Sequence, residues 1–179
     1  MSELNFEDIR PFTDTEALVA LKRIADSEMV NSISAYLWPG QDPEMTRDIL
    51  RSCRDIDEFQ SKIMIPAIEA VLAKSSKGMT FGGIDILKGV NGRCLAITNH
   101  RDIVCNLLDN KFVEDVMRIN RMIKVNRGIA ARELYLSSLR LSAYMRKVIT
   151  SGERSVWIAQ KEGRTKNGID RTSQGVLKM

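Results

Sequence analysis

The chain has 179 residues, enough for one ordinary domain or for a smaller domain with a helical extension. Hydrophobic residues make up 44% and charged residues 28%, which excludes a disordered or fibrous chain. Aromatic residues make up only 6%, which argues against a stacking platform for nucleic acid, and the net charge of +4 favours anionic partners in a general way.

The lengths of the apolar runs and the number and spacing of the cysteines predict where in the cell the protein lies. No apolar run approaches the roughly 20 residues needed to span a bilayer, and the acidic start MSELNFEDIR lacks a signal-peptide core. Cys53, Cys94 and Cys105 lack metal-ligand spacing, and a single histidine cannot build a zinc site, so we expect no metal. Cys94 lies in an apolar run and is expected to be buried. We expect a cytoplasmic protein, with peripheral contact at the inner face of the membrane as a further expectation.

The first two expected elements are helices. Thr13 and Glu16 form a capping box, which predicts a helix that ends near Ser27. A second, short helix is expected to include Ile33 and to end at the Trp-Pro-Gly sequence of residues 38–40.

Two further helices are expected before the clearest break in the chain. The Asp-Pro pair at residues 42–43 predicts a helix start, and that helix should run to about Cys53. Asp55 and Glu58 form another capping pair, which opens a longer helix that Pro66 should kink or interrupt. The break that follows predicts a helical region over residues 1–77 and a second region over residues 78–179.

The second region alternates strand and helix patterns, which predicts an α/β sheet flanked by helices. The helix over 132–149 should turn one face, that of Leu134, Leu141, Met145 and Val148, toward the core. Strands are expected over residues 79–81, 84–87, 94–98, 122–125 and 155–159, and helices over residues 112–119 and 132–149.

Polar clusters follow three of these strands, and in open α/β sheets such loops carry the functional groups. They are Asn-His-Arg-Asp at residues 99–102, Lys-Val-Asn-Arg-Gly at 124–128 and Gln-Lys-Glu-Gly-Arg-Thr-Lys at 160–166. A neutral histidine such as His100 can take a proton from a hydroxyl, and a carboxylate such as Asp102 can hold its other ring nitrogen. Arginines can grip a phosphate with forked donors, whereas the structural alternative is a set of exposed charges and weak surface ion pairs.

Three blocks together resemble the phospholipid/glycerol acyltransferases, of the 1-acylglycerol-3-phosphate acyltransferase type, in a bacterial branch. The similarity covers the chain from about Gly78 to its end. The blocks are Ala-Ile-Thr-Asn-His-Arg-Asp-Ile-Val at residues 96–104, Met-Ile-Lys-Val-Asn-Arg at 122–127 and Trp-Ile-Ala-Gln-Lys-Glu-Gly-Arg at 157–164. The resemblance implies that residues 78–179 form an acyltransferase-like α/β core.

The resemblance also implies a reaction in phospholipid biosynthesis. His100 would be the general base, with Asp102 as its carboxylate partner, for transfer of a fatty acyl group to the hydroxyl of a glycerophosphate or lysophospholipid acceptor. The donor would be acyl-CoA or acyl carrier protein, and no tightly bound cofactor, metal or nucleic acid would take part. The residues implied in substrate binding are Arg101, Lys124, Arg127, Glu162, Gly163 and Arg164.

The sequence departs from the family pattern in two ways, and the first, the absence of the aspartate, favours an alternative function. The family pairs its histidine with an aspartate several residues downstream, but the corresponding residue here is Cys105, followed by Asn106. The stretch between the first two blocks is also short, so we expect residues to be missing near Cys105-Asn106 and after Met179. The alternative is a non-catalytic module that binds anionic lipid or phosphate.

Overall fold

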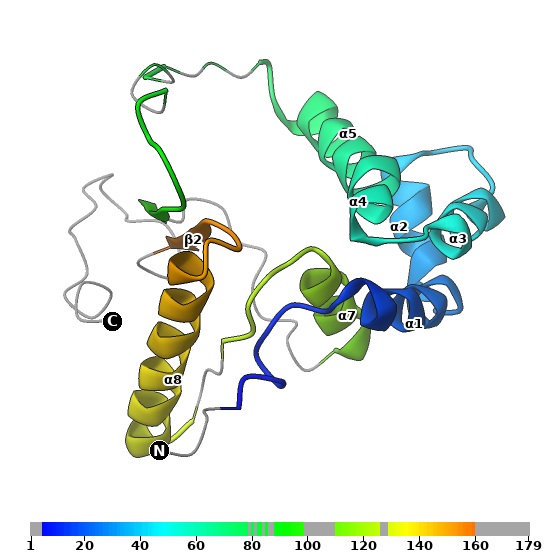
Figure 1. Ribbon diagram of the computed structural model, residues 1–179. Coiled ribbons are helices and arrows are strands. Elements are labelled where there is room, and N and C mark those ends of the chain that lie inside the picture. Colours follow the sequence, from blue (N-terminus) through cyan, green and yellow to red (C-terminus); the bar gives the residue numbers. More distant parts are fainter. Residues whose placement is uncertain are drawn as a thin grey trace. The chain divides into compact units, whose positions relative to one another are not determined.

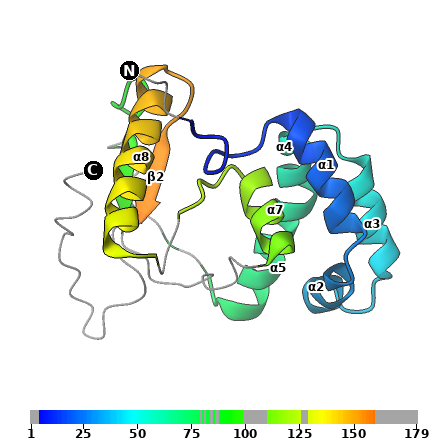
Figure 2. The same ribbon diagram turned by 90° about the horizontal axis from the view of Figure 1, so that it is seen from below.

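A computed structural model describes residues 5–78, 80, 82–83, 85, 88–98, 110–125 and 129–159. These residues are predominantly helical and include a two-stranded parallel sheet (Figure 1, and turned by 90° in Figure 2). None of the described helices is long and apolar enough to cross a membrane.

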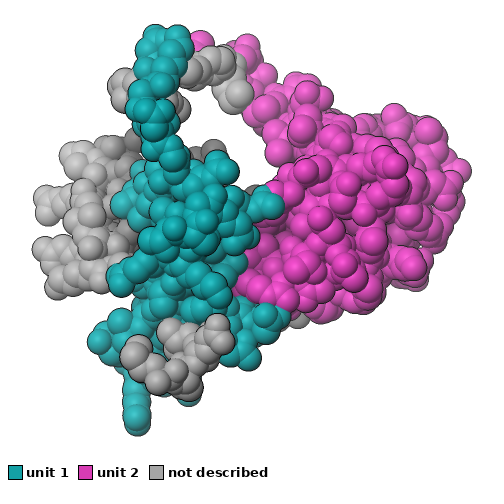
Figure 3. All heavy atoms as spheres, viewed as in Figure 1, with its two compact units in different colours: residues 1–9, 83–106, 125–179 teal, residues 10–82, 107–124 magenta. Residues whose placement is uncertain are grey.

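The chain divides into two compact units (Figure 3). The helical unit comprises residues 10–82 and 107–124, and the sheet unit comprises residues 1–9, 83–106 and 125–179. Each unit therefore contains segments from distant parts of the chain. The domain boundary expected at residue 78 stays a prediction.

Three helices of the helical unit begin at the capping residues that the sequence predicted. Thr13 and Glu16 form a complete capping box at the start of α1, and Asp42 and Asp55 cap α3 and α4 by accepting from the backbone N–H groups of Glu44 and Glu58. Each cap satisfies an N–H that the first turn of a helix leaves without a partner. The helices of this unit are α1 (Asp14–Ala25), α2 (Met29–Leu37), α3 (Pro43–Ser52), α4 (Ile56–Phe59), α5 (Ile65–Ser75) and α7 (Lys111–Ile119).

The interruption expected at Pro66 is a π-helical turn. Residues Gln60–Met64 join α4 to α5 without a break, and the Ile65 N–H donates to the carbonyl of Gln60. Proline has no N–H to give to the carbonyl four residues before it, so an ordinary α-helical turn would lose a hydrogen bond here. The wider turn lies directly before the proline and lets the helix continue.

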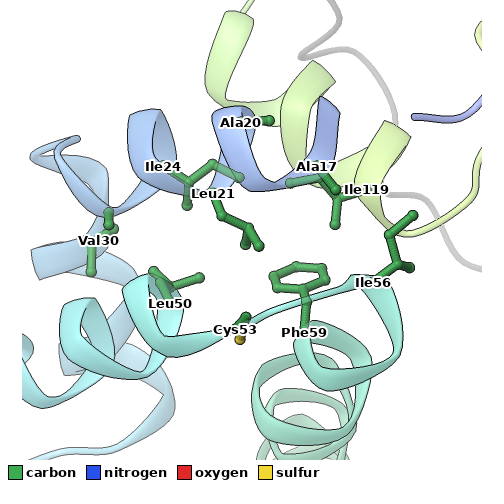
Figure 4. Packing of buried hydrophobic residues seen from close by; sticks show 11 residues of the cluster. Ala17, Ala20, Leu21, Ile24, Val30, Leu50, Cys53, Ile56, Phe59 and Ile119 are labelled. Atoms are coloured by element: carbon green, nitrogen blue, oxygen red, sulfur yellow. The ribbon is translucent and has the colours of Figure 1, made fainter. Parts of the chain in front are cut away.

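The core of the helical unit forms where α1 packs against α3 and α7 (Figure 4). Three alanines on α1 leave room for its neighbours, while Leu21 and Phe59 are the largest apolar side chains in the cluster and are almost fully buried. The buried cluster consists of Ala17, Ala20, Leu21, Ile24, Ala25, Val30, Leu50, Cys53, Ile56, Phe59 and Ile119.

The sheet unit is built on β1 (Leu95–Thr98), α8 (Ala131–Thr150) and β2 (Val156–Ala159). Leu141, Met145 and Val148 form the buried face of α8, as expected, and Val156 on β2 is buried as well. Leu134 was expected on the same face, but it is exposed. β2 lies alongside α8 (Figures 1 and 2).

Two further expectations are wrong, one about a strand and one about the burial of Cys94. Residues 122–125 are not a strand, because after α7 the chain turns through Arg121, whose φ is 61°, and the Met122 N–H donates to the Met117 carbonyl. Cys94 is exposed, as are Leu95 and Ile97, because in the described chain β1 has a partner strand on one side alone. The candidates at 79–81 and 84–87 lie largely outside the described residues.

Candidate functional site: the carboxyl edge of the sheet

The two strands that precede the polar clusters lie side by side. β1 and β2 run parallel, and their register pairs Leu95 with Val156 and Thr98 with Ala159. Both strands therefore end at the same edge, which we call the carboxyl edge. In open α/β structures this is the edge from which loops carry binding and catalytic groups.

Hydrogen bonds at the opposite ends of the strands hold this register. The Val156 N–H donates to the Cys94 carbonyl at 2.9 Å, and the Cys94 N–H donates to the Ser155 hydroxyl at 3.2 Å. The Arg93 Nε donates to the Gly152 carbonyl at 3.0 Å, in the turn that joins α8 to β2. A positive φ of 72° at Gly152 suits glycine and lets the chain reverse there. Because the starts of the strands are aligned, their ends are aligned as well.

The clusters at 99–102 and 160–166 follow these aligned ends directly in the sequence. The structure describes the strands up to Thr98 and Ala159, where the two clusters begin in the sequence.

Most of the predicted site residues lie outside the described part of the chain. The structure therefore describes the strands that lead into the two clusters and does not describe the side chains within them. The residues outside the description are His100, Arg101, Asp102, Arg127, Glu162, Gly163 and Arg164.

Lys124 is the predicted site residue that the structure describes. It belongs to the helical unit, where its Nζ lies 3.5 Å from the Glu114 carboxylate on α7. The same carboxylate lies 3.4 Å from Arg118 and 3.8 Å from Lys111. Three cations thus lie within 4 Å of one partly buried carboxylate, and Lys111 lies closer still to the neighbouring Asp115, at 3.0 Å. The spacing of Glu114 and Arg118, four residues apart, was a signal for this cluster that the sequence analysis did not use.

The described residues contain no group of three or more His, Cys, Asp or Glu side chains that could hold a metal ion. In comparisons of the chain with models of protein families, with curated proteins and with solved structures, no match was found.

Proposed function

We propose that the protein is an acyltransferase that moves a fatty acyl group from a thioester donor to the hydroxyl of a glycerophosphate or lysophospholipid acceptor. The observation that carries the proposal is the in-register, parallel pairing of Leu95–Thr98 with Val156–Ala159. The histidine cluster and the Glu-Gly-Arg cluster directly follow these two paired strands in the sequence. Clusters that follow neighbouring strand ends can act on one substrate, which supports the proposal of a shared site.

The finer fold proposal is that β1 and β2 belong to a wider acyltransferase-like sheet flanked by helices. Support comes from the apolar side chains that the two strands leave uncovered in the described chain. Leu95 and Ile97 are exposed on β1, and Trp157 is exposed on the opposite face of β2. Strands buried on both faces are rich in such residues, because helices cover both sides of a parallel sheet.

In the proposed reaction, the neutral imidazole of His100 takes the proton of the acceptor hydroxyl as its oxygen attacks the thioester carbonyl carbon. The carbon–sulfur bond then breaks, and the departing thiolate receives the proton from the imidazolium. Asp102 is the proposed partner that holds the other ring nitrogen. Arg101, Arg127 and Arg164, with Glu162 and Gly163, are proposed to hold the anionic acceptor. Holding donor and acceptor together removes much of the entropic barrier to the transfer.

The test is release of free CoA from acyl-CoA by the full-length protein, with and without glycerol 3-phosphate or lysophosphatidate. His100→Ala should abolish acceptor-dependent release while its circular dichroism spectrum matches that of the wild type. The chain contains a single histidine, so modification with diethyl pyrocarbonate offers an independent route to the same loss. Acceptor-dependent release that survives both treatments would rule out His100 as the base.

A second candidate function is a non-catalytic module that binds anionic lipid or phosphate. The observation that favours it is Cys105, which stands where the acyltransferases have the aspartate partner of the histidine. This candidate predicts no CoA release with any acceptor. It also predicts binding to anionic vesicles that weakens with salt and is unchanged by His100→Ala.

A further inference from the structure

The sheet unit contains a cavity of about 210 Å³ between α8 and the two strands. Figures 1 and 2 show α8 alongside β2 from two directions. Two residues from the strands and five from the second half of α8 form its wall. They are Leu95, Ile158, Ser142, Met145, Arg146, Ile149 and Thr150.

The wall of this cavity is mainly apolar. Leu95 and Ile158 lie on the sheet face that is turned toward α8, since Ile158 pairs with Ile97, two residues along β1 from Leu95. Leu95 nevertheless keeps 43% of its surface exposed, so α8 covers this face incompletely. The cavity is partly open to solvent, and an apolar chain that lies against its mainly apolar wall would be removed from water.

The α8 residues that line the cavity span about two turns of the helix. Ser142 and Thr150 are eight residues apart, which corresponds to about 12 Å along a helix. The turn at residues 151–155 reverses the chain between α8 and β2, so the Ser142 end lies toward the carboxyl edge of the sheet. A linear chain that lies along α8 would contact the wall over this length.

Arg146 is an exposed residue of α8 that also lines the cavity, and it adds a positive charge to the apolar wall. In the described part of the chain its guanidinium has no hydrogen bond or ion pair, whereas Arg140 on the same helix pairs with Asp8. The Cα–Cβ bonds of a helix tilt toward its amino terminus, which for α8 is the direction of the carboxyl edge. An anionic group on the ligand would give this arginine a charge-assisted partner.

We propose that this cavity binds a linear ligand with an apolar chain and a terminal carboxylate. The chain lies between α8 and the sheet, against Leu95, Ile149 and Ile158, and the carboxylate pairs with Arg146. The proposal rests on the cavity wall and Arg146 alone, so it stands whether or not the protein transfers acyl groups.

The test is calorimetric titration of the full-length protein with sodium octanoate below its micelle concentration, with 1-octanol as the uncharged probe. Octanoate should bind saturably at one site, and Arg146→Gln should weaken this binding about tenfold, since it removes a charge-assisted hydrogen bond. Octanol should bind the wild type and Arg146→Gln equally. Arg132→Gln is the matched control, because Arg132 is an exposed arginine on the first turn of α8, away from the cavity, and it should change nothing.

A second variant tests the cavity itself. Ile149→Trp adds bulk to the cavity wall and should abolish the binding of octanoate and octanol together, in a protein whose circular dichroism and thermal unfolding match the wild type. Three results would overturn the proposal: no saturable octanoate binding to the wild type, equal octanoate affinity in the wild type and Arg146→Gln, or propionate binding as tight as octanoate. If Ile149→Trp does not fold, the Arg146→Gln and propionate results decide the question.

Discussion

Replacement of Arg23 by Met should destabilise the helical unit strongly, because it leaves a buried carboxylate short of a cation. Asp115 on α7 is only 1% exposed, and Arg23 on α1 donates to its two oxygens from Nε and Nη2, each at 2.9 Å. The pairing raises the pKa of Arg23 above its ordinary value, mainly through these hydrogen bonds. The two residues are 92 positions apart in sequence, so this pair joins α7 to the amino-terminal helices.

The expected cost follows from which partner is buried. Removal of one member of a buried ion pair costs about 3–5 kcal/mol, but here Arg23 is 46% exposed and Lys111 remains 3.0 Å from the carboxylate. We therefore expect a loss of about 2 kcal/mol for Arg23→Met. Asp115→Asn should cost less, about 1 kcal/mol, because the two cations that it leaves are exposed and can be hydrated.

Arg51→Met is the matched control. Arg51 is also 46% exposed and pairs with Asp26 at 3.1 Å, but Asp26 is itself 69% exposed. An exposed pair contributes about 0–1 kcal/mol, so this variant should be close to the wild type.

The measurement is urea unfolding followed by the fluorescence of Trp38 in a Trp157→Phe background. The chain has two tryptophans, so Trp38 then reports on the helical unit alone. Equal losses for Arg23→Met and Arg51→Met would refute the argument from burial. A larger loss for Asp115→Asn than for Arg23→Met would refute the argument about which partner is left unpaired.

Two further predictions concern Glu16 and the cysteines. Hydrogen bonds from Arg10 and Thr13 lower the pKa of Glu16 from 4.5 to about 2, so its stabilising contribution is present above pH 4.5 and is lost as the pH falls toward 2. Since Glu16 is 40% exposed, we expect this contribution to the free energy of unfolding to be about 1 kcal/mol. The difference in unfolding free energy between the wild type and Glu16→Gln should therefore shrink as the pH falls from 4.5 toward 2. A difference that stays constant over this range would contradict the prediction. In a Cys105→Ser background, an aromatic disulfide reagent should modify exposed Cys94 first and Cys53 only after unfolding, because burial raises the pKa of the Cys53 thiol. Equal rates for the two thiols in the folded protein would contradict the difference in burial between Cys53 and Cys94.

The sequence by itself determined the helix starts and the positions of the two described strands. The capping residues Thr13, Asp42 and Asp55 act on N–H groups two or three residues away, so their effect depends on the local sequence alone. The same holds for the wide turn before Pro66, which follows from a missing N–H. Of the candidate site, the sequence indicated the two clusters and the strands that precede them.

Only the tertiary structure decided which elements meet. The register of β1 and β2 depends on contacts such as that between Cys94 and Ser155, which are 61 positions apart. Cys94 is exposed despite its apolar neighbours, and residues 122–125 form no strand despite a strand-like pattern. A side chain is buried, and a strand forms, only where another part of the fold packs or pairs with it. A local pattern of apolar residues shows that a segment can form such contacts, but it does not show whether the fold supplies the other surface.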